Sequence, residues 1–484
     1  MPVNHVRKEL QAVTPIYHLI RDCIAGQFAV KAKTSDYLPQ PNRLDVTPEN
    51  QARYMAYLER AVFYGVTGRT LRGLVGQVFA RDPVVELPES LQIVNTDANG
   101  EGVSLSQVAK RTLQQVLAFG RAGLFADYPA TAGTISRLEL SKGNIRPTIE
   151  GYAPLDIINW RTVSRGAREV LSLVVLMETY VEKDDGFEET LGTQYRVLSL
   201  GPTSRNPFFE PSEFYTVEVW RANSGNFGIA ESYQPSDASG RLLTEIPFTF
   251  VGAENNDSEV DNAPLFDIAA LNIAHYRNSA DYEESCFMVG QPTPVFSGLT
   301  EDWVKNVMGG VVALGSRGGV TLPAGGSASL LQASANTLVF EAMQLKERQM
   351  VALGAKLVEQ ASVQRTATEA SMENASENST LASSAKNVSE AYKFALTKCA
   401  EFVGSSGKIT FELNTDFDLS AMNAADRSEV VKSWQAGAIT FEEMRSVQKK
   451  AGIAYEDDAK AKEQIAQDSA ISLALDTVDN VAAE

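Results

Sequence analysis

The sequence predicts an α+β fold, because helical and strand-forming segments are grouped rather than alternating along its 484 residues. About the first 125 residues carry apolar side chains at helical spacing. Residues 145–250 instead contain β-branched and aromatic runs separated by turn-forming residues. The helical period returns near residue 262, in longer segments. We therefore expect a helical N-terminal part, an antiparallel sheet and then long helices.

Capping residues mark where the N-terminal helices begin. Thr47 is suited to be an N-cap, and Pro48 occupies the first helical position after it. Another helix is expected from Thr70 to Phe79, and a further one begins at Ser104. These signals predict at least three helices before the sheet.

Three apolar runs predict consecutive strands of the sheet. They are LSLVVLMETYV (171–181), TQYRVLSL (193–200) and FYTVEVWR (214–221). The segments between them, EKDDGFEETLG and GPTSRNPFFEPS, are rich in turn-forming residues. The order predicts an antiparallel meander, in which acidic pairs such as Asp184–Asp185 lie in solvated turns.

Two long helices are predicted at residues 262–289 and 335–361, each about 40 Å long. The segment between them is rich in glycine and proline and is expected to form a small knob on a two-helix stalk. Each helix carries one apolar stripe, through which we expect it to pack. The stripe residues are Ile268, Leu271, His275 and Tyr282 on the first helix, and Val339, Met343, Met350, Leu353 and Leu357 on the second.

The composition excludes several classes of function. Lys and Arg total 43 against 61 Asp and Glu, giving a formal charge of -18, whereas a protein that coats nucleic acid should be basic. Three dispersed cysteines and three histidines fit neither a disulfide scaffold nor a structural zinc site. The sequence contains no GxxxxGK[ST] or GxSxG motif. We therefore predict no catalytic residue, cofactor or metal. No signal peptide or transmembrane segment is recognisable, so we expect a soluble protein made inside the cell.

Nine segments follow one another in a recognisable order along the chain. They are YLPQP (37–41), RAVFYGVTGRTLRGLVGQVF (60–79), GRAGLFADYP (120–129), PLDIINWR (154–161), QYRVL (194–198), IPFTFVG (246–252), PLFDIAALNIAHYRNSADYEE (264–284), GQPTPVFSG (290–298) and ASENSTLASSAKNVSEAYKFAL (375–396). In these segments and their order the chain resembles the portal proteins of tailed bacteriophages, in particular a portal-like family long known only as a domain of unknown function. The resemblance extends from about residue 35 to about residue 460.

The resemblance implies a portal fold and a division of the chain into named regions. These are a wing (1–261, completed by 405–419), a first stem helix (262–289), a clip (290–334), a second stem helix (335–361), a tunnel loop (362–380), a long helix toward wing and crown (381–404), and a helical crown with an acidic tail (420–484).

The resemblance also implies a non-enzymatic function. Such proteins form a ring, usually of twelve subunits, at one capsid vertex, through which double-stranded DNA enters and leaves without sequence-specific contacts. The expected partners are the terminase large subunit, a head–tail adaptor, and the major capsid and scaffolding proteins. The protein is then expected in the virion, and in the host cytoplasm during assembly.

Two groups of site residues follow from the resemblance. Gln364, Arg365, Thr366 and Thr368 are expected to face DNA in the tunnel loop, and Trp303 and Arg317 to dock partners at the clip. Two alternatives stay open. One is another phage head structural or adaptor protein, and the other is a metal-dependent nuclease or hydrolase with an unrecognised carboxylate site.

Overall fold

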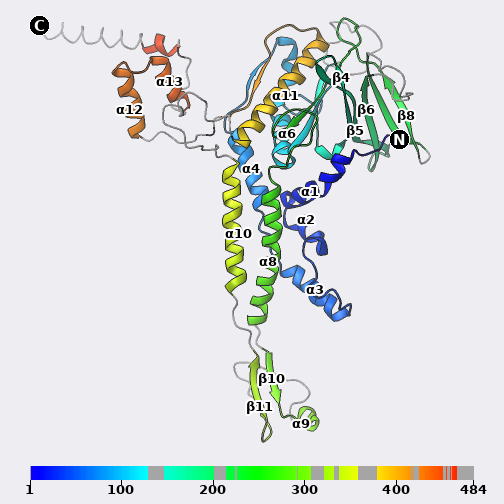
Figure 1. Ribbon diagram of the computed structural model, residues 1–484, viewed down its shortest axis with the longest axis vertical. Helices are drawn as coiled ribbons and strands as arrows, with labels where there is room; N and C mark the ends of the chain where they lie inside the picture. Colours follow the sequence, from blue (N-terminus) through cyan, green and yellow to red (C-terminus); the bar gives the residue numbers. More distant parts are fainter. Residues whose placement is uncertain are drawn as a thin grey trace, which may run out of the picture. The chain divides into compact units, whose positions relative to one another are not determined.

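The computed structural model forms two compact units, Met1–Thr415 and Asp416–Glu484. It describes residues 2–128, 146–200, 214–223, 226–290, 293–306, 321–331, 337–357, 379–415, 417, 424–450, 454, 458 and 460–465. Figure 1 shows the first unit as helices and sheets from which two long helices extend. The two units are described separately below.

Most of the N-terminal part of the first unit is helical, and Thr47 and Ser104 are N-caps, as expected from the sequence. The Thr47 hydroxyl accepts a hydrogen bond from the Asn50 amide (3.4 Å) at the start of α3. Ser104 and Gln107 form a reciprocal capping box at the start of α6. The helices are α1 (Lys8–Ala25), α2 (Gln27–Ala32), α3 (Pro48–Arg60), α4 (Val66–Val78), α5 (Gln92–Thr96) and α6 (Leu105–Phe119), with 3-10 turns at Thr34–Asp36, Glu89–Leu91 and Pro154–Asp156.

A five-stranded antiparallel sheet confirms the predicted meander. Each strand pairs with the next along the chain, and Figure 1 shows β4, β5 and β6 side by side. One face of this sheet supplies Val174, Leu176 and Leu198 to the main core. The strands are β4 (Ile157–Arg165), β5 (Arg168–Asp184), β6 (Glu189–Leu200), β7 (Tyr215–Asn223) and β8 (Asn226–Tyr233).

A second, three-stranded sheet corrects the expectation that the first 125 residues are helical. β2 (Arg121–Asp127) lies between β3 (Thr148–Tyr152) and β9 (Phe248–Gly252). Six of its seven residues are buried, so the strand lacks the alternating polarity that would reveal it in the sequence. Gly123 has to lack a side chain here, because a Cβ atom would lie 2.5 Å from the Phe248 ring.

A buried arginine fastens the three-stranded sheet to the main core. The guanidinium of Arg121 lies 4.3 Å from the centroid of the Trp160 ring and 3.8 Å from that of the Phe250 ring. It donates hydrogen bonds to the carbonyls of Ser258 (3.1 Å) and Glu259. Burial lowers the pKa of Arg121 to about 10, which leaves it charged at neutral pH. The cation therefore holds the loop after β9 against two aromatic rings.

Two long helices and a small insert follow this loop. α8 spans Phe266–Gly290 and α10 spans Thr337–Lys356. Between them, β10 (Thr293–Ser297) pairs antiparallel with β11 (Ser327–Leu331), and the short helix α9 (Glu301–Asn306) lies in the connection. Figure 1 shows α8 and α10 side by side, with the β10–β11 pair beyond their ends.

The first unit is completed by α11 (Thr380–Val403) and β12 (Thr410–Glu412). Ser379 caps α11, so the predicted tunnel loop (362–380) overlaps the start of this helix. β12 pairs with β1 (Val84–Glu86), a strand that the sequence did not reveal. The second unit contains α12 (Ala424–Gln435) and α13 (Phe441–Lys450), whose Trp434 and Phe441 rings make an edge contact at 5.9 Å.

Candidate assembly and docking surfaces

The two long helices form an antiparallel pair that is joined by polar side-chain contacts. His275 Nε2 lies 3.2 Å from Glu347 Oε1, and Lys346 Nζ donates to Asn278 Oδ1 at 2.7 Å. The rings of Tyr282 and Phe340 are 5.8 Å apart. As the residue number increases along α8, the number of the contacting residue on α10 decreases, so the two helices run in opposite directions. The polar contacts fix one register between the two helices.

The stripe residues named from the sequence differ in burial. Ile268, His275 and Met350 are buried in the first unit. The other six are half-buried; they are Leu271, Tyr282, Val339, Met343, Leu353 and Leu357. Half-burial means that one chain covers these side chains only in part.

Helix α10 also exposes apolar side chains outside its stripe. Leu345 is 51% exposed and Val351 70% exposed, although both belong to a helix that packs against α8 in the same unit. Phe340 is 43% exposed beside its contact with Tyr282. Exposed large side chains at several positions of one helix are typical of a surface that contacts another protein.

The insert at the far end of α8 and α10 carries Trp303 on α9. Trp303 is half-buried, and its indole Nε1 donates to the carbonyl of Thr321 at 3.3 Å. Val304, next to it, is 37% exposed. Arg317, the second predicted docking residue, lies outside the described residues.

The predicted DNA-facing residues Gln364, Arg365, Thr366 and Thr368 also lie outside the described residues. The described chain stops at Leu357 and resumes at Ser379. The Leu381 amide donates to the Leu357 carbonyl at 3.1 Å, so the two ends of this segment meet.

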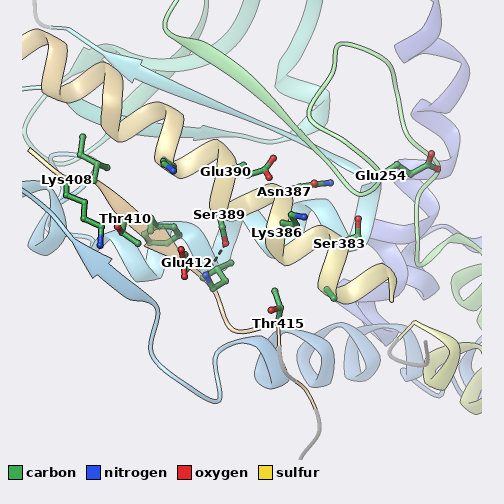
Figure 2. A pocket seen from close by; sticks show the side chains of 15 residues that line it. Glu254, Ser383, Lys386, Asn387, Ser389, Glu390, Lys408, Thr410, Glu412 and Thr415 are labelled. Atoms are coloured by element: carbon green, nitrogen blue, oxygen red, sulfur yellow. Dashed lines mark hydrogen bonds between the residues drawn. The ribbon is translucent and has the colours of Figure 1, made fainter. Parts of the chain in front are cut away.

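A groove of about 1000 Å³ runs between α11 and β12. Figure 2 shows Lys386, Ser389 and Glu390 on the helix side and Thr410 and Glu412 on the strand side. The Ser389 hydroxyl accepts a hydrogen bond from the Leu413 amide at 3.0 Å, which ties the two walls together. Among the described residues that line the groove there is no histidine or cysteine, so the lining offers charge and hydrogen bonds but no nucleophile with a histidine base.

A half-buried polar network joins the two sheets. Arg196 on β6 contacts Asp127 on β2 (2.7 Å) and Glu178 on β5 (2.8 Å). Tyr152 on β3 donates to Glu178 at 2.5 Å. Burial raises the pKa of Asp127, against the opposing effect of Arg196. Burial, with Asp127 as the next cause, raises the pKa of Glu150 to about 7. The network is a structural connection between the sheets.

Sequence reasoning missed the charged ends of strand β5. The β4–β5 turn brings Arg165 opposite Arg168, and the β5–β6 turn brings Asp184 opposite Glu189. The signal was present, because SRGAR and EKDDGFEE flank a strand that the sequence does predict.

The described part of the chain holds no group of three or more His, Cys, Asp or Glu side chains placed to bind a metal ion. Within the same part, none of the helices combines the length and the apolar character needed to cross a membrane. Cys23 and Cys399 are buried and Cys286 is exposed, all as free thiols.

Comparisons with known proteins give one family and several structures. Residues 264–403 match a family described as a domain of unknown function (DUF4055). One similar structure is a chain from the neck of an empty GTA particle computed with C6 symmetry. It has a TM-score of 0.41 and 13% identity, over 90% of this chain and 100% of that chain.

Two further similar chains come from related particles, each covering 87% of this chain and 98% of its own length at 12% identity. One belongs to the virion of a native gene transfer agent (GTA) particle, with a TM-score of 0.41. The other belongs to the neck of a native GTA particle computed with C12 symmetry, with a TM-score of 0.39. No curated protein matches the chain.

Proposed function

We propose that the chain is a non-enzymatic phage head–tail structural protein. More specifically, it acts as a portal subunit that forms a ring of about twelve copies at one capsid vertex. Double-stranded DNA passes through the ring during packaging and ejection. The terminase large subunit supplies the ATP-driven work, and the insert between α8 and α10 docks terminase and then the adaptor. Capsid and scaffolding proteins contact the periphery.

One observation carries this proposal: the antiparallel α8–α10 pair holds a small strand-and-helix insert at its end and exposes apolar side chains on α10. Leu345 and Val351 are more than half exposed in the single chain. Burying such side chains is worth about 25 cal/mol per Å² of apolar area. A ring provides that cover for every copy, because each subunit meets the next through two different surfaces.

The test is the mass and symmetry of the purified chain. We expect mass photometry to show a species near 630 kDa, about twelve times the 52.5 kDa chain. Negative-stain averages should show rotational symmetry and a central channel. A single 52.5 kDa species at micromolar concentration and every salt tested would overturn the proposal. Labelling the protein in procapsids and finding it at more than one vertex would also contradict it.

A further inference from the structure

Strand β5 ends in two hairpins of opposite charge. The basic hairpin end, residues 161–169, contains three arginines and one glutamate. The acidic hairpin end, residues 182–189, contains five carboxylates and one lysine. Arg168 and Asp184 are the first and last residues of β5, so about 50 Å of strand separates them. The two ends therefore cannot meet within one chain.

Each end places like charges directly opposite each other. Arg165 faces Arg168 across the β4–β5 turn, and Asp184 faces Glu189 across the β5–β6 turn. Like charges in a cross-strand pair destabilise a hairpin. Among the described residues, no ion pair joins Arg165 or Arg168 to a carboxylate, or Glu189 to a cation. A partner of the opposite charge would relieve the repulsion at either end.

An apolar cross-strand pair lies close to the charged pair at each end of β5. Val163 faces Val170 beyond the Ser164–Glu169 pair, and Val181 faces Leu191 beyond the Lys183–Thr190 pair. Val163 and Val170 are half-buried, and Val170 packs against the main core of its own chain. Val181 and Leu191 are exposed, so the acidic hairpin end can add apolar contact area to a charged contact.

Hydrogen bonds to two aspartates stabilise the turn of the acidic hairpin end. Asp184 accepts a hydrogen bond from the Gly186 amide (2.7 Å). Asp185 accepts from the amides of Phe187 (2.9 Å) and Glu188 (2.8 Å), and these bonds lower the pKa of the Asp185 carboxyl. The turn presents Phe187 fully exposed. A fixed turn loses little entropy on binding, and an exposed aromatic side chain is a suitable anchor.

We propose that the acidic hairpin end of one copy docks on the basic hairpin end of the next copy. The inference rests on the proposed ring, and it names a contact that joins its subunits head to tail. Nucleic acid is the rival occupant of the basic end. Binding of nucleic acid there would give the acidic hairpin end no role, and the formal charge of -18 on the chain disfavours such binding.

The test exchanges the charges of the two ends. The acid-reversed variant carries Glu182→Arg, Glu188→Arg and Glu189→Arg, and it retains Asp184 and Asp185 for the turn. The base-reversed variant carries Arg161→Glu, Arg165→Glu and Arg168→Glu. Each variant then has two ends of the same sign, so its copies repel. We expect either variant alone to assemble about tenfold more slowly or worse at low salt.

Mixing the two variants separates repulsion from misfolding. An equimolar mixture can alternate along a ring, and the chain with all six substitutions again has opposite ends. Both should regain most of the wild-type assembly rate. The control Glu89→Arg with Glu101→Arg changes two exposed carboxylates elsewhere and should assemble normally. A milder variant, Glu182→Gln with Glu188→Gln and Glu189→Gln, should slow assembly less, and 0.5 M salt should reduce every difference.

The inference is overturned if both variants assemble like the wild type while wild-type rings form, in which case the ring itself stands. It is also overturned if circular dichroism shows folded variants whose mixture fails to assemble. A base-reversed variant that assembles normally but retains less DNA would assign the basic end to nucleic acid instead. A wild-type chain that never assembles would overturn the ring and the contact together.

Discussion

His275 Nε2 and Glu347 Oε1 lie 3.2 Å apart across the antiparallel α8–α10 pair. The two partners differ in environment, because the His275 side chain is 3% exposed and that of Glu347 is 46% exposed. A hydrogen bond that is half open to water contributes about 1 kcal/mol or less. The buried ring contributes mainly by filling space between the helices.

We therefore expect the two partners to tolerate substitution differently. His275→Ala leaves a cavity and should lower the free energy of unfolding by about 2–3 kcal/mol. Glu347→Gln keeps a hydrogen-bonding group and should cost less than about 1 kcal/mol. Thermal unfolding followed by circular dichroism measures both changes. If both variants lower the free energy of unfolding by the same amount, the hydrogen bond, rather than the packing of the His275 ring, provides the stability.

Two apolar residues of α10 are expected to separate folding from assembly. Met350 is 1% exposed within the chain and Leu345 is 51% exposed. Met350→Asp buries an unpaired charge and should destabilise the subunit itself by about 3 kcal/mol or more. Leu345→Asp should leave the melting temperature of the subunit unchanged and reduce ring formation.

Mass photometry and thermal unfolding of both variants check this prediction. The half-buried residues Val339, Met343 and Leu353 should show both effects when changed to Asp. Normal rings from Leu345→Asp would mean that this face of α10 is not covered by a neighbouring copy.

The spacing of apolar residues, together with turn-forming and capping residues, predicted the meander and the two long helices. Both features depend on residues that are close together in the sequence. Within the described residues, α8 begins at Phe266 rather than at residue 262, and α10 spans Thr337–Lys356. β2 was missed because a fully buried strand has no alternating pattern. The β1–β12 pair was missed because it joins residues 84–86 to residues 410–412, and pairing over such a separation leaves no local signal.

The candidate surfaces divide in the same way. The stripes of α8 and α10 could be read from helical spacing, whereas the opposed charges at the two ends of β5 require the register of the strands. Arg165 and Arg168 are near neighbours in the sequence, but only the two-residue turn between them makes them a cross-strand pair.

The role of Trp303 in docking is testable because its hydrogen bond can be removed with or without its ring surface. Trp303→Ala removes both the ring surface and the hydrogen bond to the Thr321 carbonyl. We expect intact rings and weaker terminase-dependent packaging, since tryptophan is common at binding hot spots. Trp303→Phe keeps most of the ring surface and should retain most packaging. Rings that dissociate, or an insoluble chain, would show that Trp303 stabilises the insert instead.

Arg365 remains a prediction from the sequence. It is the only charged residue between Glu359 and Glu369. Twelve such arginines would form a cationic ring whose exposed contacts to phosphates are individually weak at physiological salt. Arg365→Glu should leave ring assembly unchanged and shorten the packaged DNA or reduce its retention. Protected fragments from mutant and wild-type procapsids, sized on a gel, measure this, and equal full-length protection would refute the role.

Glu150 on β3 gives the fold a pH dependence with a definite sign. Burial raises the pKa of its carboxyl from 4.5 to about 7, with Asp127 as the next cause. The folded chain therefore holds this proton more tightly than the unfolded chain does. The resulting stability is present below pH 4.5 and is lost as the pH rises to about 7.

Replacing Glu150 removes this loss. Glu150→Gln cannot ionise, so it should be more stable than the wild type at pH 8 and equally stable near pH 4. Allowing for partial solvent exposure, we expect a gain of about 1–2 kcal/mol at pH 8, seen as a melting temperature a few degrees higher. Glu188→Gln on the exposed β5–β6 turn is the matched control and should change stability by less than about 0.5 kcal/mol. A Glu150→Gln gain that is the same at pH 4 and pH 8 would show that side-chain packing, and not the buried charge, sets the difference.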